Sequence, residues 1–266
     1  MPTIRKRYTV SFLLGSKSAA SAKAAMGTAV AACIIITVAC STSSPEAIQP
    51  KPENDIQTSF RWIPNGSVDL MSPEGTFIRA AAESWWLARA EPGDGMEAIT
   101  NGGYPGFDRV FNNVWPPGEV GGAGHFGTPV LGTDYFEVIG LSREGDRVTA
   151  QYCQYASMTA IKASDGKYHS PGPVEISGNG RSITFGPDPS VAPEHQRPPL
   201  VDQKGPSNRP DVNVFGSWVL FDSGGLKSGG NRCAKTAPNT PPDNPDGYVG
   251  ERPPPTLPPS PGWPDG

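Results

Sequence analysis

The sequence predicts an α+β domain, with two or three helices followed by an antiparallel sheet. After Ser72, apolar residues recur at the spacing of one helix face. From Asp134 onward, apolar and polar residues instead alternate in short runs, which is typical of strands. Because the helical segments come first and the strands follow as a group, the α+β class is predicted rather than an alternating α/β fold.

The first helix is predicted to begin at Ser72, Pro73 and Glu74. Ser72 supplies a capping hydroxyl, proline is tolerated in the first turn, and an acid there interacts favourably with the helix dipole. A proline and a glycine at 92–93 end the helix. One face is apolar and is expected to cover a sheet; its members are Phe77, Ile78, Ala81, Trp85 and Ala88.

A second helical stretch is predicted around 96–99, and it resumes over 107–114 after a glycine-rich break at 102–106. Strands then follow, and the turn residues 143–146 predict a hairpin between the first two. The predicted strands are 135–141, 147–155, 158–163, 181–185 and 214–222, and a proline-rich insertion spans 187–211.

Segments that are poor in apolar residues flank the predicted domain, which spans residues 72–235. Residues 40–71 are expected to form a disordered tether, because they bury too little apolar surface to offset the entropy lost on ordering. At the other end, 11 of the 29 residues from 238 to 266 are proline, which excludes helix and sheet. Residues 236–266 are therefore predicted to be a disordered, Pro-rich tail.

The N-terminus has the order of a bacterial export signal. Basic residues such as Arg5, Lys6 and Arg7 precede an uncharged stretch over 24–39, and small polar residues follow. This stretch has 16 residues, whereas a membrane-spanning helix needs about 20. Residues 1–39 are therefore predicted to be a cleaved signal peptide.

Thr37-Val38-Ala39-Cys40 resembles the lipobox of bacterial lipoproteins. The resemblance implies that Cys40 carries acyl chains such as palmitate and holds the protein on the outer face of the cell membrane. Cys33 ends a similar tetrapeptide, Val30-Ala31-Ala32-Cys33, but cleavage there would truncate the apolar core and leave three isoleucines near the start of the mature chain. An ordinary secreted protein, or an uncleaved anchor with an incidental Cys40, is the alternative.

Composition excludes several function classes. The formal net charge is −4 and the basic residues are scattered, which argues against a nucleic-acid partner. No cysteine pair has C-x-x-C spacing, which argues against zinc and thioredoxin-like chemistry. Cys153 and Cys233 lie in a domain that is predicted to be exported, and we expect them to form a disulfide; two free thiols are the alternative.

The predicted domain resembles the NTF2-like (cystatin-like) domains of secreted actinobacterial lipoproteins over residues 72–235. The residues that carry the resemblance are Trp85, Tyr104, Val148 to Cys153, Asp165 to Lys167, Ser217 to Leu220 and Cys233. The resemblance implies helices packed on a curved antiparallel sheet that together form a cone. It also implies the same cysteine pairing. The insertion at 187–211 and the glycine-rich stretch 118–127 depart from the pattern.

Catalytic motifs are weak. Residues 122–127 match G-x-G-x-x-G, but neither a strand before them nor a helix after them is predicted, so a loop is favoured. His125, His169 and His195 are far apart in the sequence and predict no metal site. No cofactor is predicted.

Two sets of residues are candidates for a site inside the cone. Trp85, Tyr104, Phe107 and Trp115 are candidates for lining an apolar pocket, with core packing as the alternative. The acidic candidates for a carboxylate in the cavity are Asp108, Asp134 and Glu137, and solvated positions are the alternative for them.

The first functional hypothesis is a membrane-anchored, non-enzymatic envelope lipoprotein whose domain binds an apolar ligand or an envelope protein. The second is a small hydrolase or isomerase that uses a carboxylate buried in the cone. The third is a structural spacer between the membrane and the cell wall. A buried carboxylate beside a second polar group in the cavity would favour the enzyme, and a wholly apolar cavity would favour binding.

Overall fold

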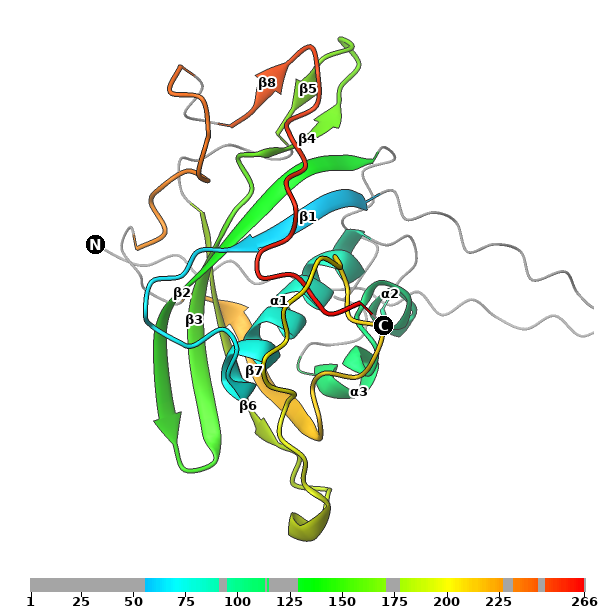
Figure 1. The fold of residues 1–266 in the computed structure, drawn as a ribbon, viewed down its shortest axis with the longest axis vertical. Coiled ribbons are helices and arrows are strands. Elements are labelled where there is room, and N and C mark those ends of the chain that lie inside the picture. Colours follow the sequence, from blue (N-terminus) through cyan, green and yellow to red (C-terminus); the bar gives the residue numbers. More distant parts are fainter. Residues whose placement is uncertain are drawn as a thin grey trace, which may run out of the picture. The chain divides into compact units, whose positions relative to one another are not determined.

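The fold is seen in a computed structural model (Figure 1). It describes residues 56–90, 95–112, 114, 129–170, 178–226, 232–243 and 247–265, all within the unit Pro50–Gly266. The predicted signal peptide, with Cys33, and the predicted lipidation site Cys40 lie outside these residues. In the described part of the chain, no helix has the length and apolar character needed to cross a membrane.

The helices occur where the sequence predicts them. Helix α1 spans Pro73–Ala90, and the Ser72 hydroxyl accepts a hydrogen bond of 3.1 Å from the backbone N–H of Gly75 at its start. Helices α2 (Met96–Gly102) and α3 (Phe107–Phe111) follow. The predicted capping residue therefore marks the beginning of the longest helix.

Five strands match the predicted ones, and the first two form the predicted hairpin. These strands are β2 (Val130–Glu144), β3 (Arg147–Tyr155), β4 (Thr159–Lys162), β6 (Asn179–Pro187) and β7 (Trp218–Gly225). The short strands β5 (Tyr168–His169) and β8 (Val249–Gly250) and a single turn of 3-10 helix at Pro193–His195 complete the elements after α3. Gly145 occupies the hairpin turn with φ 57°, a conformation that glycine adopts without strain.

The strands form one sheet in the order β7-β6-β3-β2-β4-β5-β8, with antiparallel neighbours throughout this path. The sheet curls around α1, and α2 and α3 lie on the other side of that helix (Figure 1). The α+β class with helices packed on an antiparallel sheet is therefore confirmed. Phe77 of α1 stacks on Phe185 of β6, with ring centroids 4.4 Å apart, at the centre of the core.

One strand lies in the segment that the sequence predicts to be a disordered tether. Strand β1 (Ile56–Trp62) pairs in parallel with the first half of β2. Its residues Phe60 and Trp62 are 4% and 3% exposed. The prediction is wrong for this part of 40–71, because two aromatic side chains in a short alternating run bury enough surface to order it.

The C-terminal segment 247–265 packs on the domain, which contradicts the predicted disordered tail. Ser260 and β1 exchange backbone hydrogen bonds, with Trp62 N–H donating to Ser260 and Ser260 N–H donating to Phe60. Trp263 near the end of the chain is only 1% exposed. Proline limits regular pairing here to the short strand β8, and a single large aromatic side chain anchors the segment in the core.

A buried acid and a buried base on α1, Glu83 and Arg79, receive this segment. Glu83 of α1 is 1% exposed and accepts hydrogen bonds from Trp62 Nε1 (2.6 Å), Tyr104 OH (2.6 Å) and Trp263 Nε1 (2.9 Å). Arg79, one turn earlier, donates to the backbone carbonyls of residues 203, 261 and 262, and its guanidinium lies over the Trp263 ring. Burial raises the pKa of Glu83, and the positive charge of Arg79 opposes this shift.

Cys153 and Cys233 form a disulfide in the structure, with their Cα atoms 5.5 Å apart. Cys153 points to the face of β3 opposite that of Tyr152, because side chains alternate along a strand. A second, smaller apolar cluster forms around the bridge on this outer face, with Tyr155 among its members. The disulfide therefore attaches the segment after β7 to the outside of the sheet.

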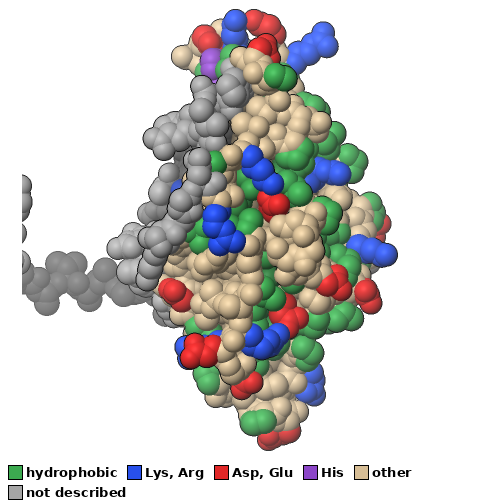
Figure 2. Space-filling view, turned by 90° about the vertical axis from the view of Figure 1, so that its left-hand side faces the viewer, with side chains coloured by type: hydrophobic (Ala, Val, Ile, Leu, Met, Phe, Trp, Pro, Cys, Tyr) green, Lys and Arg blue, Asp and Glu red, His purple; other side chains and the backbone are tan. Residues whose placement is uncertain are grey.

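The outer surface carries charges of both signs. On the face shown in Figure 2, basic and acidic side chains are interspersed rather than gathered. Glu137 illustrates the pattern, since its carboxylate accepts hydrogen bonds from Tyr155 OH (2.8 Å) and Asn65 Nδ2 (3.1 Å) and pairs with Lys235 Nζ at 2.6 Å. The carboxylate of Glu137 therefore has three polar partners on the outer face of the sheet.

Candidate functional site

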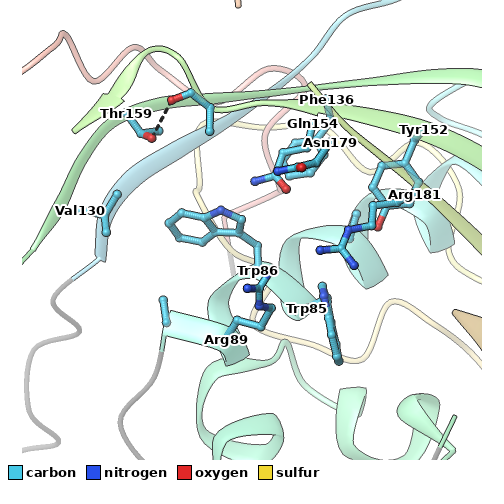
Figure 3. Close-up of a pocket in the computed structure, with 13 residues that line it drawn as sticks. Trp85, Trp86, Arg89, Val130, Phe136, Tyr152, Gln154, Thr159, Asn179 and Arg181 are labelled. Atoms are coloured by element: carbon cyan, nitrogen blue, oxygen red, sulfur yellow. Dashed lines mark hydrogen bonds between the residues drawn. The ribbon is translucent and has the colours of Figure 1, made fainter. Parts of the chain in front are cut away.

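A cavity of about 260 Å³ lies between the C-terminal half of α1 and the concave face of the sheet (Figure 3). Helix α1 contributes Ala82, Trp85, Trp86, Arg89 and Ala90. The sheet side includes Val130 and Phe136 of β2, Tyr152 and Gln154 of β3, and Asn179 and Arg181 of β6. The cavity therefore has an aromatic wall on the helix and a mixed wall on the sheet.

Two tryptophans form the aromatic wall, and neighbouring rings hold both of them. Trp86 meets Phe60 edge to face, with ring centroids 5.4 Å apart, and Trp85 stacks on Phe111 at 5.9 Å. Both indoles are partly exposed and border the cavity. Rings held in this way offer a flat apolar surface at little further cost in side-chain entropy.

Of the aromatic residues that the sequence offers as pocket lining, Trp85 alone among the described ones borders the cavity. Tyr104 and Phe107 are 2% and 1% exposed, and the prediction is wrong for them. Both pack in the core instead, Tyr104 against Trp263 and Phe107 against Phe215. Trp115 lies outside the described residues.

Two arginines reach the cavity from elements far apart in the sequence. Figure 3 shows the guanidinium groups of Arg89, on α1, and Arg181, on β6, both beside the cavity. Within the described ranges, neither side chain has a hydrogen bond or an ion pair. Burial lowers the pKa of Arg89, and the nearby positive charge of Arg181 lowers it further.

Polar side chains from β3 and β6 complete the sheet wall. Gln154 is the direct partner of Asn179 across the two strands, and Tyr152 is the direct partner of Arg181. All four side chains border the cavity and therefore form a compact polar patch on the concave face. Burial raises the pKa of Tyr152 to about 12, so its hydroxyl keeps its proton at neutral pH.

A buried carboxylate lies next to this patch. Asp134 is fully buried, and its Oδ2 atom accepts a hydrogen bond of 2.6 Å from Gln154 Nε2. Its Oδ1 atom has no hydrogen-bond partner in the described part of the chain. Burial raises the pKa of Asp134 to about 7, although hydrogen bonds from Gln154 and from the backbone of Tyr135 partly oppose the shift.

The other two acidic candidates lie elsewhere. Asp108 is exposed on α3, and Glu137 lies on the outer face of the sheet with three partners. Asp134 shares its face of β2 with Phe136, which borders the cavity, because the two residues are two positions apart. The structure therefore separates the three acids that the sequence could not rank.

We expect the stability of the wild type to fall with pH because of Asp134. Its pKa is about 7 in the folded protein and about 3.9 in an unfolded chain. Between these values the folded state binds one more proton, and its free energy of unfolding falls by about 1.4 kcal/mol per pH unit. The stabilisation is complete below the unfolded pKa and is lost as the pH rises through the folded one.

Urea denaturation of the wild type and of Asp134→Asn at pH 5 and pH 7 checks this expectation. Relative to the variant, the wild type should lose about 2 kcal/mol between these two pH values. The comparison cancels the contributions of other groups, since both proteins share them. A difference between the two proteins that does not change with pH would show that Asp134 titrates normally.

The remaining sequence candidates are not assembled into a site. His169 pairs with Asp165 on the surface at 2.9 Å, and His195 is exposed in the 3-10 turn. His125 and the glycine motif at 122–127 lie outside the described residues. No group of three or more potential metal ligands occurs among the side chains that the structure describes.

Sequence reasoning missed the polar half of the cavity. Arg89 follows Trp85 by one helical turn, and this spacing could have indicated a shared surface. Arg181, Asn179 and Gln154 carry no such local signal, because strand pairing alone brings them together. Their convergence depends on the register between β3 and β6.

The fold and the cavity define the protein as an α+β domain with a preformed pocket between one helix and a curled sheet. No family model matches the chain, and no curated protein or solved structure is significantly similar to it. Its function is therefore inferred from the chemistry of the pocket.

Proposed function

We propose that the protein is a cell-envelope lipoprotein whose α+β domain binds a small, partly apolar ligand. The observation that carries the proposal is the cavity of about 260 Å³ with two indoles on one wall and polar side chains on the other. Ligand sites are typically preformed, largely apolar, and supplied with a few polar groups that orient the ligand. The cavity has each of these properties.

In this proposal, acyl chains on Cys40 hold the protein on the extracytoplasmic face of the cell membrane. The order of basic residues, apolar stretch and cysteine over residues 5–40 supports export and lipidation. The disulfide between Cys153 and Cys233 is consistent with this compartment, since disulfides persist mainly in oxidising surroundings. The partners are therefore the membrane itself and the pocket ligand.

We also propose that the domain is an NTF2-like cone. In support, α1 lies against the concave face of the curled sheet, and the cavity opens between them. The cysteine pair and the late tryptophan strand β7 also agree with that family pattern. The parallel strand β1 and the packed C-terminal segment are additions to this pattern.

Two measurements test the proposed function. The intact mass of protein extracted from membranes is expected to correspond to a chain that begins at Cys40 with acyl chains attached. Cys40→Ala should abolish the acylated form, and Cys33→Ala should leave the mature mass unchanged because residue 33 is removed with the signal. A mass that retains residues 1–39 would contradict the anchor.

For the pocket, calorimetry with phenylbutyramide is expected to show saturable binding to the wild type. Ala90→Phe adds a ring at the edge of the cavity and should abolish binding, because it fills the space that the probe needs. Leu141→Phe adds bulk at an exposed position on the hairpin and is the matched control. Equal binding by both variants would show that the probe binds somewhere else.

A hydrolase or isomerase remains the second candidate function, and Asp134 favours it. This carboxylate is buried beside a polar cavity, and its Oδ1 atom has no hydrogen-bond partner among the described residues. However, Asp134 does not border the cavity, whereas Gln154, which donates to it, does. A ligand would meet Gln154 first, and for this reason we place binding ahead of catalysis.

A further inference from the structure

We propose that the pocket ligand is an amphipathic oxyanion, with its acid group held by Arg89 and Arg181 and its apolar body against Trp85 and Trp86. This inference rests on the proposed function and specifies the chemistry of its ligand. The acid group is a carboxylate or a phosphate, since both present the planar or paired oxygens that a guanidinium recognises.

Two positive charges lie beside the cavity. Arg89 and Arg181 both border it, and they lie close enough for their positive charges to repel each other. In the described part of the chain, no carboxylate forms an ion pair with either of them. An oxyanion between them would replace this repulsion with two charge-assisted hydrogen bonds.

The buried acid next to the polar patch does not neutralise the pair. Asp134 binds a proton with a pKa of about 7, and so carries only part of a negative charge at neutral pH. The amide of Gln154 occupies its Oδ2 atom and stands between Asp134 and the cavity. The cavity therefore presents positive charge to a ligand.

The sheet wall of the cavity also supplies hydrogen-bond donors. The Tyr152 hydroxyl and the Asn179 amide border the cavity, and neither has a side-chain hydrogen bond within the described residues. The strand register places them beside Arg181 and Gln154 in a two-by-two patch. Oxyanions accept hydrogen bonds and donate none at full charge, so a patch of donors suits them.

An apolar wall faces this polar patch. Figure 3 shows the Trp86 indole on the helix side of the cavity and Arg181 on the sheet side. The same wall includes Trp85 on α1, and Phe136 and Val130 of β2 are apolar. A ligand that satisfies both walls needs an acid group at one end and an apolar body at the other.

Four probes that carry a phenyl ring on a short alkyl chain of similar length test this inference on the full chain by calorimetry. Phenylbutyrate and phenethyl phosphate carry an acid group, phenylbutyramide is neutral, and phenylbutylamine is cationic. We expect the tighter-binding acid to exceed the amide by about tenfold in affinity, the value of one charged hydrogen bond, and the amine to bind least. Which acid binds more tightly identifies the carboxylate or the phosphate as the preferred group.

Three variants locate the acid group. Arg181→Gln and Arg89→Gln should each lower the affinity for the preferred acid by about tenfold, while the affinity for the amide stays within about twofold. Arg252→Gln removes the same charge at an exposed position outside the cavity and should change neither. Because Arg89 is exposed, its variant keeps the test valid even if Arg181→Gln fails to fold.

Equal affinities for the acids and the amide would overturn the inference and leave the pocket itself supported. Unchanged binding of the acid by Arg89→Gln would also overturn it, because the charge would then act from elsewhere. If none of the four probes binds the wild type, the proposed function fails together with the inference. Tighter binding of the amine would show that the cavity selects cations instead.

Discussion

Replacing Glu83 by alanine is expected to lower the free energy of unfolding by about 3–5 kcal/mol, the usual cost of leaving a buried charge uncompensated. The variant leaves the indole N–H groups of Trp62 and Trp263 and the hydroxyl of Tyr104 without their acceptor. It also leaves the guanidinium of Arg79 buried without its acidic neighbour. Urea denaturation followed by circular dichroism measures the loss.

Glu97→Ala is the matched control, because Glu97 is an exposed acid on the neighbouring helix α2. Its free energy of unfolding should stay within about 0.5 kcal/mol of the wild type. Proteolysis gives a second readout, since the C-terminal segment depends on Glu83 through Trp263 and should be cut earlier in Glu83→Ala. Equal stability of the two variants would mean that Glu83 is not buried in solution.

Removing the disulfide is expected to have the next largest effect. The bridge joins residues 80 positions apart, and closing a loop of this length removes about 4 kcal/mol of unfolded-state entropy in the chain-entropy model. The double variant Cys153→Ala with Cys233→Ala should therefore unfold at a clearly lower urea concentration. The smaller apolar cluster around Tyr155 should loosen with it, because it packs around the bridge.

The wild type treated with a reductant provides the comparison for this second result. It should approach the stability of the double variant, and the double variant should not respond to the reductant. A wild type that keeps its stability under reducing conditions, with both thiols shown to be free, would mean that the bridge contributes little. The mass gain of two hydrogens on reduction confirms that the thiols were paired.

Local signals predicted the regular elements well. Ser72 caps α1 as the spacing of hydroxyl, proline and acid predicts, and Gly145 turns the hairpin between β2 and β3. In β3 the alternation of apolar positions predicts which side chains enter the core. These features depend on residues a few positions apart, and so the sequence displays them directly.

Segments that depend on distant partners were predicted incorrectly. The sequence of strand β1 was predicted to be a tether because its neighbour in the sheet, β2, begins about 70 residues later and leaves no local signal of the pairing. The C-terminal segment was predicted to be disordered from its proline content. That composition gives no sign that Trp263 packs against Arg79 and Glu83, which lie about 180 residues earlier. In both cases one or two aromatic side chains outweigh the polar composition around them.

In the candidate site, too, the features that depend on nearby residues were predicted and those that depend on distant contacts were not. Trp85 was predicted to line a pocket because it is one of a group of aromatic residues, and it does border the cavity. Tyr104 and Phe107 belonged to the same group but are core residues. Nothing local distinguishes Asp134 from Asp108, because burial of a carboxylate depends on what covers it. Arg89 and Arg181 border the same cavity only because α1 lies against the curled sheet.

The sequence by itself determined the helices, the hairpin and the class of fold, because hydrophobic periodicity and turn chemistry act within a few residues. It also predicts export and a lipid on Cys40 from the N-terminal segment. Only the tertiary structure decided the parallel strand, the anchored C-terminus and the polar wall of the cavity. These features arise from contacts between residues far apart in the chain, which no local pattern records.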